Sequence, residues 1–285
     1  MKVLLTSLLA LTTSAFALDL PADFKGPLGL QLYSLRETFK TDPIAALDKT
    51  KAFGFTSAEL YSSLPLEPEK LKGLLAERGI APVSGHFSYD TLKKDLAGSV
   101  KAAQTLGLKF AGVAWIPHEV GSFGEADVKR AAADFHEFGA AFKAAGIQFF
   151  YHTHGYEFRP VAEGSTETFF DLLARETKPD LVAFEMDVFW VVHPGGDPVK
   201  LLAKYPGRWA LMHLKDIRKG AQTGVFTGHA PLTDDVPLGT GMVNWPAVLK
   251  QGAESGVKYY FIEDESPTVL DALPVTTKYL QSVKF

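Results

Sequence analysis

Short apolar runs alternate with longer amphipathic segments along most of this 285-residue chain. The apolar runs have the length expected of strands that are buried on both faces. The segments between them repeat their apolar positions every three to four residues, as one face of a helix does. Eight strands are predicted, at 28–35, 55–61, 81–87, 110–116, 148–154, 181–190, 210–216 and 259–265.

Helices are predicted between these strands, and glycines mark where several of them end. The predicted helices are 42–53, 68–78, 92–106, 125–145, 166–176, 198–205 and 245–255, with a closing helix at 267–284. The glycines that follow them closely, and that can adopt a helix-stopping left-handed conformation, are Gly54, Gly79, Gly107, Gly146, Gly207 and Gly256. Strands that alternate with helices form a parallel sheet, and eight such units predict a single α/β domain, a closed (β/α)8 TIM barrel.

Two further features of the pattern bear on this fold. A doubly wound open sheet is the alternative, but it usually has a glycine-rich phosphate turn after an early strand, and this sequence has none. The connection 217–244 contains five glycines and shows little periodicity. Long connections of this kind in compact domains are usually lids or binding loops, so we expect it to border a ligand site.

The first 17 residues predict a secretory signal peptide. Met1-Lys2 is a basic start, residues 3–11 are mostly apolar, and Ala15-Phe16-Ala17 is an A-x-A cleavage site. The apolar run is too short to span a bilayer. We therefore expect export, to a bacterial periplasm, and a mature barrel domain at 18–285. Because the chain has no cysteine, its stability must come from core burial rather than from disulfides.

Charge and hydropathy argue against two kinds of partner. The formal net charge is −4 and the sequence has no basic run, which disfavours a nucleic-acid groove. After residue 17 no apolar stretch is long enough to be a membrane span. The composition is that of a soluble enzyme or binding protein.

Three charged residues interrupt apolar segments in the last third of the chain, namely Asp187, His213 and Glu263. A charged side chain in a doubly buried strand is costly unless it is paired or binds a metal. A carboxylate, an imidazole and a second carboxylate suit a divalent cation if the three strands are neighbours. The sequence therefore predicts a metal site in this part of the barrel.

Other polar and aromatic residues gather near the predicted carboxyl ends of the strands, where such barrels place their active sites. They are Gln31, Tyr33, Arg36, Glu59, His86, Trp115, His118, His152, His154, Glu157, Trp190, Lys215, Asp216 and Glu265. Trp115 and Trp190 lie closest to the predicted mouth, so we expect them to form walls of a pocket. Glu59 and His86 either contact a ligand or satisfy a neighbouring polar group.

The order of these motifs resembles that of the sugar phosphate isomerase/epimerase family, the xylose isomerase-like TIM barrels that also include endonuclease IV. The segments that carry the resemblance are Gly29-Leu-Gln-Leu-Tyr-Ser-Leu-Arg36, Tyr151-His-Thr-His-Gly-Tyr-Glu-Phe158, Met186-Asp187 with Gly195-Gly-Asp-Pro198, His213-Leu-Lys-Asp216 and Phe261-Ile-Glu-Asp-Glu265. Together they span essentially the whole chain after residue 17.

The resemblance implies one divalent ion, Mn²⁺, Co²⁺, Mg²⁺ or Zn²⁺, held by side chains of the last four strands. Asp187, His213 and Glu263 match three of the family's four ligands. Where the sugar epimerases have a strand-end glutamate, this chain has His152, as in a subgroup with a Tyr-His-x-His pattern. An imidazole is a good ligand for Mn²⁺, Co²⁺ or Zn²⁺. His154 and Glu157 are the alternative fourth ligands.

The activity implied by the resemblance is a metal-dependent isomerase or epimerase that forms an enediolate by removing an α-proton. Export and the lack of a phosphate loop favour a non-phosphorylated sugar or keto sugar as substrate. The candidate catalytic residues are Glu263, His152, His154 and Glu157, and the candidate substrate-binding residues are Gln31, Tyr33, Glu59, His86, Trp115, Trp190 and Lys215. Loss of a β-leaving group from the same enediolate would instead make an inosose-type dehydratase or a 3-keto-glycoside lyase or hydratase.

Two other classes remain as alternatives. A non-catalytic periplasmic sugar-binding protein could use the same barrel, because fold does not fix function, although the predicted metal ligands favour an enzyme. Repair of the endonuclease IV type would need a basic DNA-binding face, which the charge distribution does not provide. Dimers and tetramers are common in the family, so the resemblance also implies a homo-oligomer as one possible state.

Overall fold

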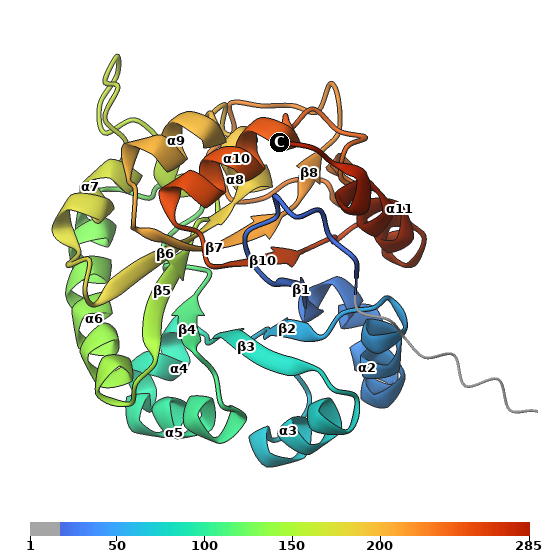
Figure 1. Ribbon diagram of the computed structural model, residues 1–285. Coiled ribbons are helices and arrows are strands. Elements are labelled where there is room, and N and C mark those ends of the chain that lie inside the picture. Colours follow the sequence, from blue (N-terminus) through green and yellow to red (C-terminus); the bar gives the residue numbers. More distant parts are fainter. Residues whose placement is uncertain (1–17) are drawn as a thin grey trace, which may run out of the picture.

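Residues 18–285 are described by the computed structural model, and the predicted signal peptide at 1–17 lies outside the described residues. Eight parallel strands close into a barrel in the order β1-β10-β7-β6-β5-β4-β3-β2, which confirms the predicted (β/α)8 fold (Figure 1). The strands are β1 (Leu28–Gln31), β2 (Ser57–Leu60), β3 (Ala81–His86), β4 (Phe110–Val113), β5 (Gln148–His152), β6 (Val182–Asp187), β7 (Trp209–Leu214) and β10 (Tyr259–Ile262).

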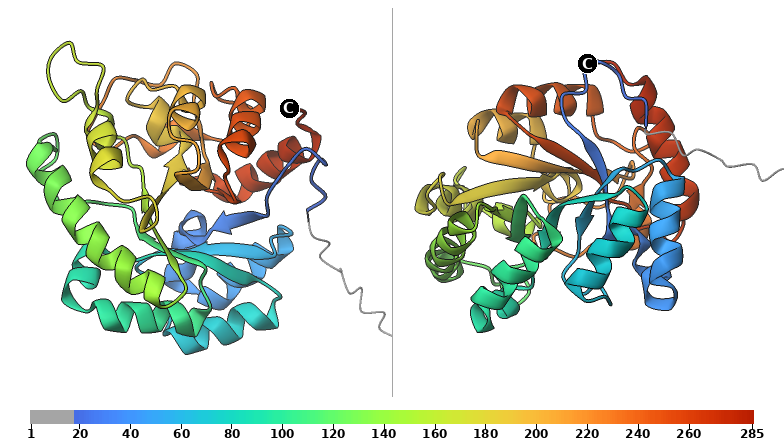
Figure 2. Two further views of the ribbon diagram at one scale, coloured as in Figure 1. Left: turned by 60° about the vertical axis from the view of Figure 1, so that its left-hand side comes forward. Right: turned by 60° about the horizontal axis from the view of Figure 1, so that its bottom comes forward.

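Helices surround the barrel and lie outside the strands in every view (Figures 1 and 2). They are α1 (Arg36–Thr41), α2 (Pro43–Ala52), α3 (Pro68–Glu77), α4 (Tyr89–Lys94), α5 (Leu96–Leu106), α6 (Glu125–Ala144), α7 (Phe169–Glu176), α8 (Val188–Val192), α9 (Pro198–Lys204), α10 (Trp245–Ser255) and α11 (Val269–Ser282). Gly107 (φ 76°) and Gly256 (φ 91°) end α5 and α10 in the left-handed conformation, as predicted. Among residues 18–285 no helix is long and apolar enough to cross a membrane.

The strands carry an apolar layer directly before their polar carboxyl ends. Phe150 and Leu211 belong to a buried apolar cluster to which β3, β4, β5, β6, β7 and β10 all contribute. Side chains alternate along a strand, so a residue two positions further on faces the same side. Those positions are His152 and His213. The apolar cluster therefore forms a floor beneath the polar groups that the next section describes.

Some predicted boundaries are wrong. Residues 32–35 form a 3-10 helix, η1 (Leu32–Leu35), and residues 188–190 belong to α8, so β1 and β6 end earlier than predicted. Most residues of both segments are buried, and a buried helical turn is as apolar as a buried strand. Hydrophobicity alone therefore cannot separate the two.

The predicted helix at 92–106 is also two helices rather than one, α4 and α5. Asp95 lies between them, and its side chain accepts a hydrogen bond from the backbone N–H of Gly98, which starts α5. An aspartate at this position caps the helix that follows it. A further short helix, α1, occupies residues for which no element was predicted.

The connection 217–244 contains some regular structure. β8 (Asp216–Ile217) and β9 (Asp235–Val236) pair as an antiparallel ribbon. A turn of 3-10 helix, η3 (Leu232–Asp234), directly precedes β9. These elements are too short to give a periodic signal in the sequence, which is why they were not predicted.

Candidate active site

The parallel register brings polar residues of neighbouring strands to the same level. His152 of β5 pairs with Glu185 of β6, and Asp187, at the end of β6, pairs with His213 of β7. Glu263 directly follows β10, which pairs with β7 on its other side. The four predicted metal ligands, His152, Asp187, His213 and Glu263, therefore come from four adjacent strands of the barrel.

The ligand atoms of the predicted metal site face one another. Asp187 Oδ2 lies 3.7 Å from His213 Nδ1 and 3.8 Å from His152 Nε2. His213 Nδ1 lies 3.3 Å from Glu263 Oε2. Atoms that share one cation through bonds of roughly 2.1 Å are about 3 to 3.5 Å apart, so these separations suit a common ion. Asp187, His213 and Glu263 form one group whose ligand atoms all lie within 4.8 Å of one another, and His152 lies outside this group but beside Asp187.

The chemistry of these side chains also fits a divalent cation. Asp187 and His213 are fully buried, and Asp187 Oδ2 has no hydrogen-bond partner among the described residues. A buried carboxylate oxygen without a partner is costly, and a cation would satisfy it. Two imidazole nitrogens and two carboxylates are donors that suit Mn²⁺, Co²⁺ and Zn²⁺. Of the candidate fourth ligands, His152 is the one whose ring nitrogen faces Asp187 Oδ2, at 3.8 Å.

The charges around His213 also favour a cation at this site. Burial alone would lower the pKa of His213, but Glu185, Glu263 and Glu59 outweigh burial and raise this pKa well above its usual value. Burial would raise the pKa of Glu263, but Lys215 and His213 lower it well below its usual value. The ionised carboxylates around His213 therefore create a negative potential there, which attracts positive charge. A divalent cation at His213 Nδ1 would supply that charge in place of a proton.

A cavity of about 500 Å³ opens at the carboxyl ends of the strands, beside this cluster. The predicted site residues that line it are Gln31, Tyr33, His86, Trp115, His152, His154, Trp190, Lys215 and Glu263. Residues 228–232 of the connection 217–244 also line it, so the expectation that this connection borders a site is confirmed. Asp187 and His213 are fully buried and are not among the residues that line the cavity.

The connection is held against the cavity at two points. Gly228 has φ +71°, and a Cβ there would lie 2.8 Å from the ring of Trp115 and 3.2 Å from His154 Nδ1. A larger residue would push the loop away from both rings. Towards the other end, the buried carboxylate of Asp216 accepts hydrogen bonds from Trp245 Nε1 (2.9 Å) and from the backbone of the connection. Asp216 therefore anchors the loop rather than entering the cavity.

Two ionisable side chains, His154 and Lys215, lie against Trp190, and their pKa values are shifted in opposite directions. His154 stacks on the indole, with ring centroids 4.6 Å apart, and burial, His152 and Lys215 together lower the pKa of His154 well below its usual value. Lys215 Nζ lies 5.8 Å from the Trp190 ring centre and 3.2 Å from Glu263. Burial would lower the pKa of Lys215, but its carboxylate neighbours raise it well above the usual value. A neutral imidazole and an ammonium therefore share one wall of the cavity.

Glu59 and Glu157, predicted as substrate-binding and catalytic residues, also lie away from the cavity. Glu59 is fully buried, and its carboxylate contacts His213 and His86, so the structure does not place it where a substrate would bind. Glu157 is fully buried in the turn η2 (Tyr156–Phe158), where its Oε1 accepts the backbone N–H of His154 at 2.8 Å. It does not belong to the group of atoms that would hold a cation.

Glu185 is a fully buried carboxylate that is not among the predicted site residues. It lies two positions before Asp187 on β6, and its carboxylate contacts His86, His152 and His213. A signal for it is present in the sequence, because residues two apart on a strand face the same side. The connection also adds His229 and Asp235 to the cavity wall, which strand ends alone could not reveal.

Residues 47–285 match the family model of the xylose isomerase-like TIM barrel. The chain belongs to this family. The match covers well over half of the sequence and agrees with both the closed barrel and the order of the strand-end motifs. Membership in the xylose isomerase-like TIM barrels thus confirms the family that the sequence motifs indicated.

Known relatives of this xylose isomerase-like barrel include enzymes of more than one name. An inosose dehydratase from Clostridium botulinum is 24% identical over 275 residues, which cover 84% of this chain and 88% of the relative. A sugar phosphate isomerase/epimerase from Parabacteroides distasonis has a TM-score of 0.74 at 24% identity and covers 91% of this chain and 97% of its own. A structure of the IolI protein with a bound zinc atom has a TM-score of 0.71 at 16% identity, covering 91% and 99%. The two structural likenesses show the fold.

Proposed function

We propose that this chain is a divalent-metal-dependent lyase that removes water from a non-phosphorylated keto polyol or keto sugar. The observation that carries this proposal is the pairing of a neutral imidazole, His154, with an ammonium, Lys215, on one indole beside the cation site. Neighbouring groups whose pKa values are pushed apart are the usual mark of a base and an acid. The inosose dehydratase relative supports the same reaction class.

The charges of the cavity support a neutral substrate. Among the described residues no arginine lines the cavity, and its lysine, Lys215, already pairs with Glu263 and Glu265. Asp90 and Asp235 add further carboxylates to the wall. A phosphate dianion placed there would face several negative charges without a free cation. Aromatic rings such as Trp115 and Trp190 offer surfaces on which a sugar or cyclitol ring can stack.

His152, Asp187, His213 and Glu263 would hold the cation. When bound, the ion would polarise the substrate carbonyl and make the adjacent C–H more acidic. The neutral ring of His154 then takes the α-proton, and the electron pair of that C–H bond forms an enediolate. The C–O bond at the β-carbon breaks with its electron pair on oxygen, and Lys215 Nζ supplies a proton to the leaving hydroxide. The products are water and an unsaturated ketone.

Isomerisation or epimerisation is the second candidate, because it uses the same enediolate. The match to a family that includes sugar isomerases, and the likeness to the Parabacteroides structure, are what favour it. Elimination is preferred because it also needs an acid for the leaving group, and Lys215 is placed to serve as one. An epimerase would instead need an acid that returns a proton to carbon.

Location is part of the proposal. The basic start, the apolar run and the A-x-A site in residues 1–17 favour export to a periplasm. N-terminal sequencing of protein recovered from an expressing bacterium is expected to begin near Leu18. A chain that keeps Met1 and stays in the cytoplasmic fraction would contradict export without affecting the proposed reaction.

The reaction is tested by loading the protein with Mn²⁺ or Co²⁺ and offering a keto inositol in D₂O. Mass spectrometry is expected to show a product that has lost one water. An isomer of unchanged composition that carries solvent deuterium would instead establish the isomerase. Binding without any turnover of this or other keto sugars, by metal-loaded protein, would establish a sugar-binding protein and overturn both enzymatic proposals.

A further inference from the structure

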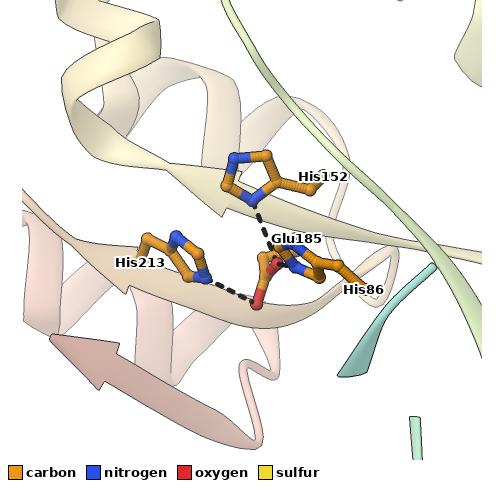
Figure 3. Close-up of side chains that lie close together, drawn as sticks. All are labelled: His86, His152, Glu185 and His213. Carbon is orange, nitrogen blue, oxygen red and sulfur yellow. Dashed lines mark hydrogen bonds and ion pairs between the residues drawn. The ribbon is translucent and has the colours of Figure 1, made fainter. Parts of the chain in front are cut away.

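The two imidazole ligands face buried carboxylates on the side away from the cation site. His152 Nδ1 lies 3.0 Å from Glu185 Oε2, and His213 Nε2 lies 2.6 Å from Glu59 Oε1. These are hydrogen-bond distances, shorter than the 3.7 and 3.8 Å that separate the same two rings from Asp187 Oδ2. Figure 3 shows His86, His152 and His213 gathered around Glu185. The carboxylates therefore form a layer beneath the proposed ligands.

His86 joins the two carboxylates of this layer. Its Nε2 lies 2.9 Å from Glu185 Oε2 and 3.2 Å from Glu59 Oε1. Gln31 Nε2 donates a further hydrogen bond to Glu59 Oε1, at 2.8 Å. Both buried carboxylates are thus fixed in place by neighbours that would not touch the cation.

The two proposed ligands need opposite tautomers. A neutral imidazole has one N–H and one nitrogen lone pair. The cation site would use Nε2 of His152 but Nδ1 of His213. An ionised carboxylate accepts an N–H and repels a lone pair. Glu185 therefore requires the N–H of His152 on Nδ1, and Glu59 requires the N–H of His213 on Nε2.

We propose that Glu185 and Glu59 are positioning residues of the metal site, each selecting the tautomer and orientation of one imidazole ligand. The inference rests on the proposed metal-dependent function and extends it to residues that touch neither cation nor substrate. Outer partners of this kind typically change metal affinity by 10- to 100-fold. This positioning role also explains why the carboxylates of Glu185 and Glu59 are buried inside the barrel beneath the cavity.

A second cation is the competing interpretation of the same layer. His86, His152, Glu185 and His213 form a group whose donor atoms are close enough to share an ion. With both ions present, each of the two shared rings would bind metal through both nitrogens and would have to lose its remaining N–H. The observed separations of 2.6 to 3.0 Å suit hydrogen bonds instead. The number of ions bound separates the two interpretations.

The first experiment reads the tautomers directly in the Zn²⁺-loaded wild type, with ¹⁵N-labelled histidine and NMR. One ligand ring is expected as the Nδ1–H tautomer and another as the Nε2–H tautomer, with one ion bound per chain. Two ions per chain, or the same tautomer at both rings, would overturn the positioning role. Failure of the wild type to bind any ion would instead overturn the metal site on which the proposal rests.

The second experiment compares the Zn²⁺ affinity of Glu185→Gln and Glu59→Gln with that of the wild type, by competition with a chromophoric chelator. A glutamine amide oxygen accepts a hydrogen bond more weakly than a carboxylate does, and the amide also brings an N–H group towards the imidazole. Each variant is therefore expected to bind Zn²⁺ 10- to 100-fold more weakly. Glu157→Gln is the matched control, an equally buried glutamate outside the layer, and its affinity is expected to stay that of the wild type.

Co²⁺ spectra and thermal unfolding complete this comparison. A ligand ring that has changed tautomer or orientation shifts the visible Co²⁺ bands, whereas a general loss of stability does not. Wild-type affinity in both folded layer variants would overturn the proposal while leaving the metal site standing. Should either variant fail to fold, the tautomers of the wild type still decide the question.

Discussion

At the scale of single residues, the site depends on which of several similar side chains has the right neighbours. Asp187, His213 and Glu263 were identifiable because each interrupts an apolar strand. Glu185 does so as well, but the contact that gives it a role, with His152, joins positions 33 apart in the sequence. Such a contact follows from the pairing of β5 with β6, and no local pattern encodes it.

Ionisation of Glu157 is expected to make the stability of the protein depend on pH, and this effect can be measured separately from metal binding. Burial raises the pKa of the Glu157 carboxyl to about 7, against an unfolded value near 4.5. Between these values the folded state binds more protons than the unfolded state, so stability falls as the pH rises from about 4.5 to 7. The full effect is on the order of 3 kcal/mol. Glu157→Gln removes this dependence.

The measurement is the difference in unfolding free energy between wild type and Glu157→Gln, from denaturant curves at several pH values. The wild type is expected to lose stability relative to the variant as the pH rises through this window. A difference that stays constant from pH 4.5 to 7 would show that the carboxyl titrates normally.

His154 and Lys215 are expected to act on the substrate without holding the ion. His154→Gln removes the proposed base, and Lys215→Met removes the proposed acid while keeping much of the side-chain volume. Each is expected to lower kcat by about 10²- to 10⁴-fold, the usual worth of a general acid or base. Elemental analysis is expected to find the ion still bound in both. Retention of wild-type kcat by either variant would remove that residue from the mechanism.

At the scale of elements, the side chain of Asp187, the last residue of β6, also caps the helix α8. Asp187 Oδ1 accepts the backbone N–H of Trp190 at 3.1 Å and so starts α8, while Oδ2 faces the cation site. The predicted strand 181–190 ran through this point because Val188, Phe189 and Trp190 are as apolar as the strand before them. The capping role of Asp187 was therefore hidden within a residue that the sequence identified only as a candidate ligand.

Two substitutions of Asp187 separate its roles as cap and ligand. Asn keeps an acceptor oxygen for Trp190 N–H, whereas Ala does not, and loss of such a cap typically costs about 1 kcal/mol. Both variants are expected to lose the ion, because neither carries a carboxylate. Asp187→Asn is expected to be the more stable by about that amount. Denaturant unfolding without added metal, with elemental analysis alongside, makes the test. Equal stability of the pair would contradict the capping role.

At the scale of the whole molecule, the connection 217–244 borders the cavity because the side chain of Asp216 holds the end of this connection in place. Among the donors to this buried carboxylate are Gly239, Gly241 and Trp245. The sequence predicted a binding loop from its glycines, and the structure confirms that 228–232 line the cavity. How the loop is held could not be predicted, because the anchor is a strand-end residue that resembled a catalytic candidate.

Asp216→Ala would leave those donors without an acceptor. Each buried donor left unpaired costs about 1–3 kcal/mol, so we expect a loss of at least about 3 kcal/mol in stability. Limited proteolysis is expected to cut first within 218–244. KM should rise while the ion is retained, because Asp216 does not contact the proposed ligands. Resistance of the loop to protease at wild-type level would refute the anchoring role.

The proposed ligands occupy one arc of the barrel, the adjacent strands β5, β6, β7 and β10. The facing arc contributes Tyr33, Tyr61, Ser88 and Tyr89 from the segments after β1, β2 and β3. The residues proposed to hold the ion and these residues of the cavity wall thus come from separate stretches of the polypeptide. Exchange of the segments near 33, 61 and 88 is therefore expected to change which compounds the cavity accepts, while the residues proposed to hold the ion stay in place.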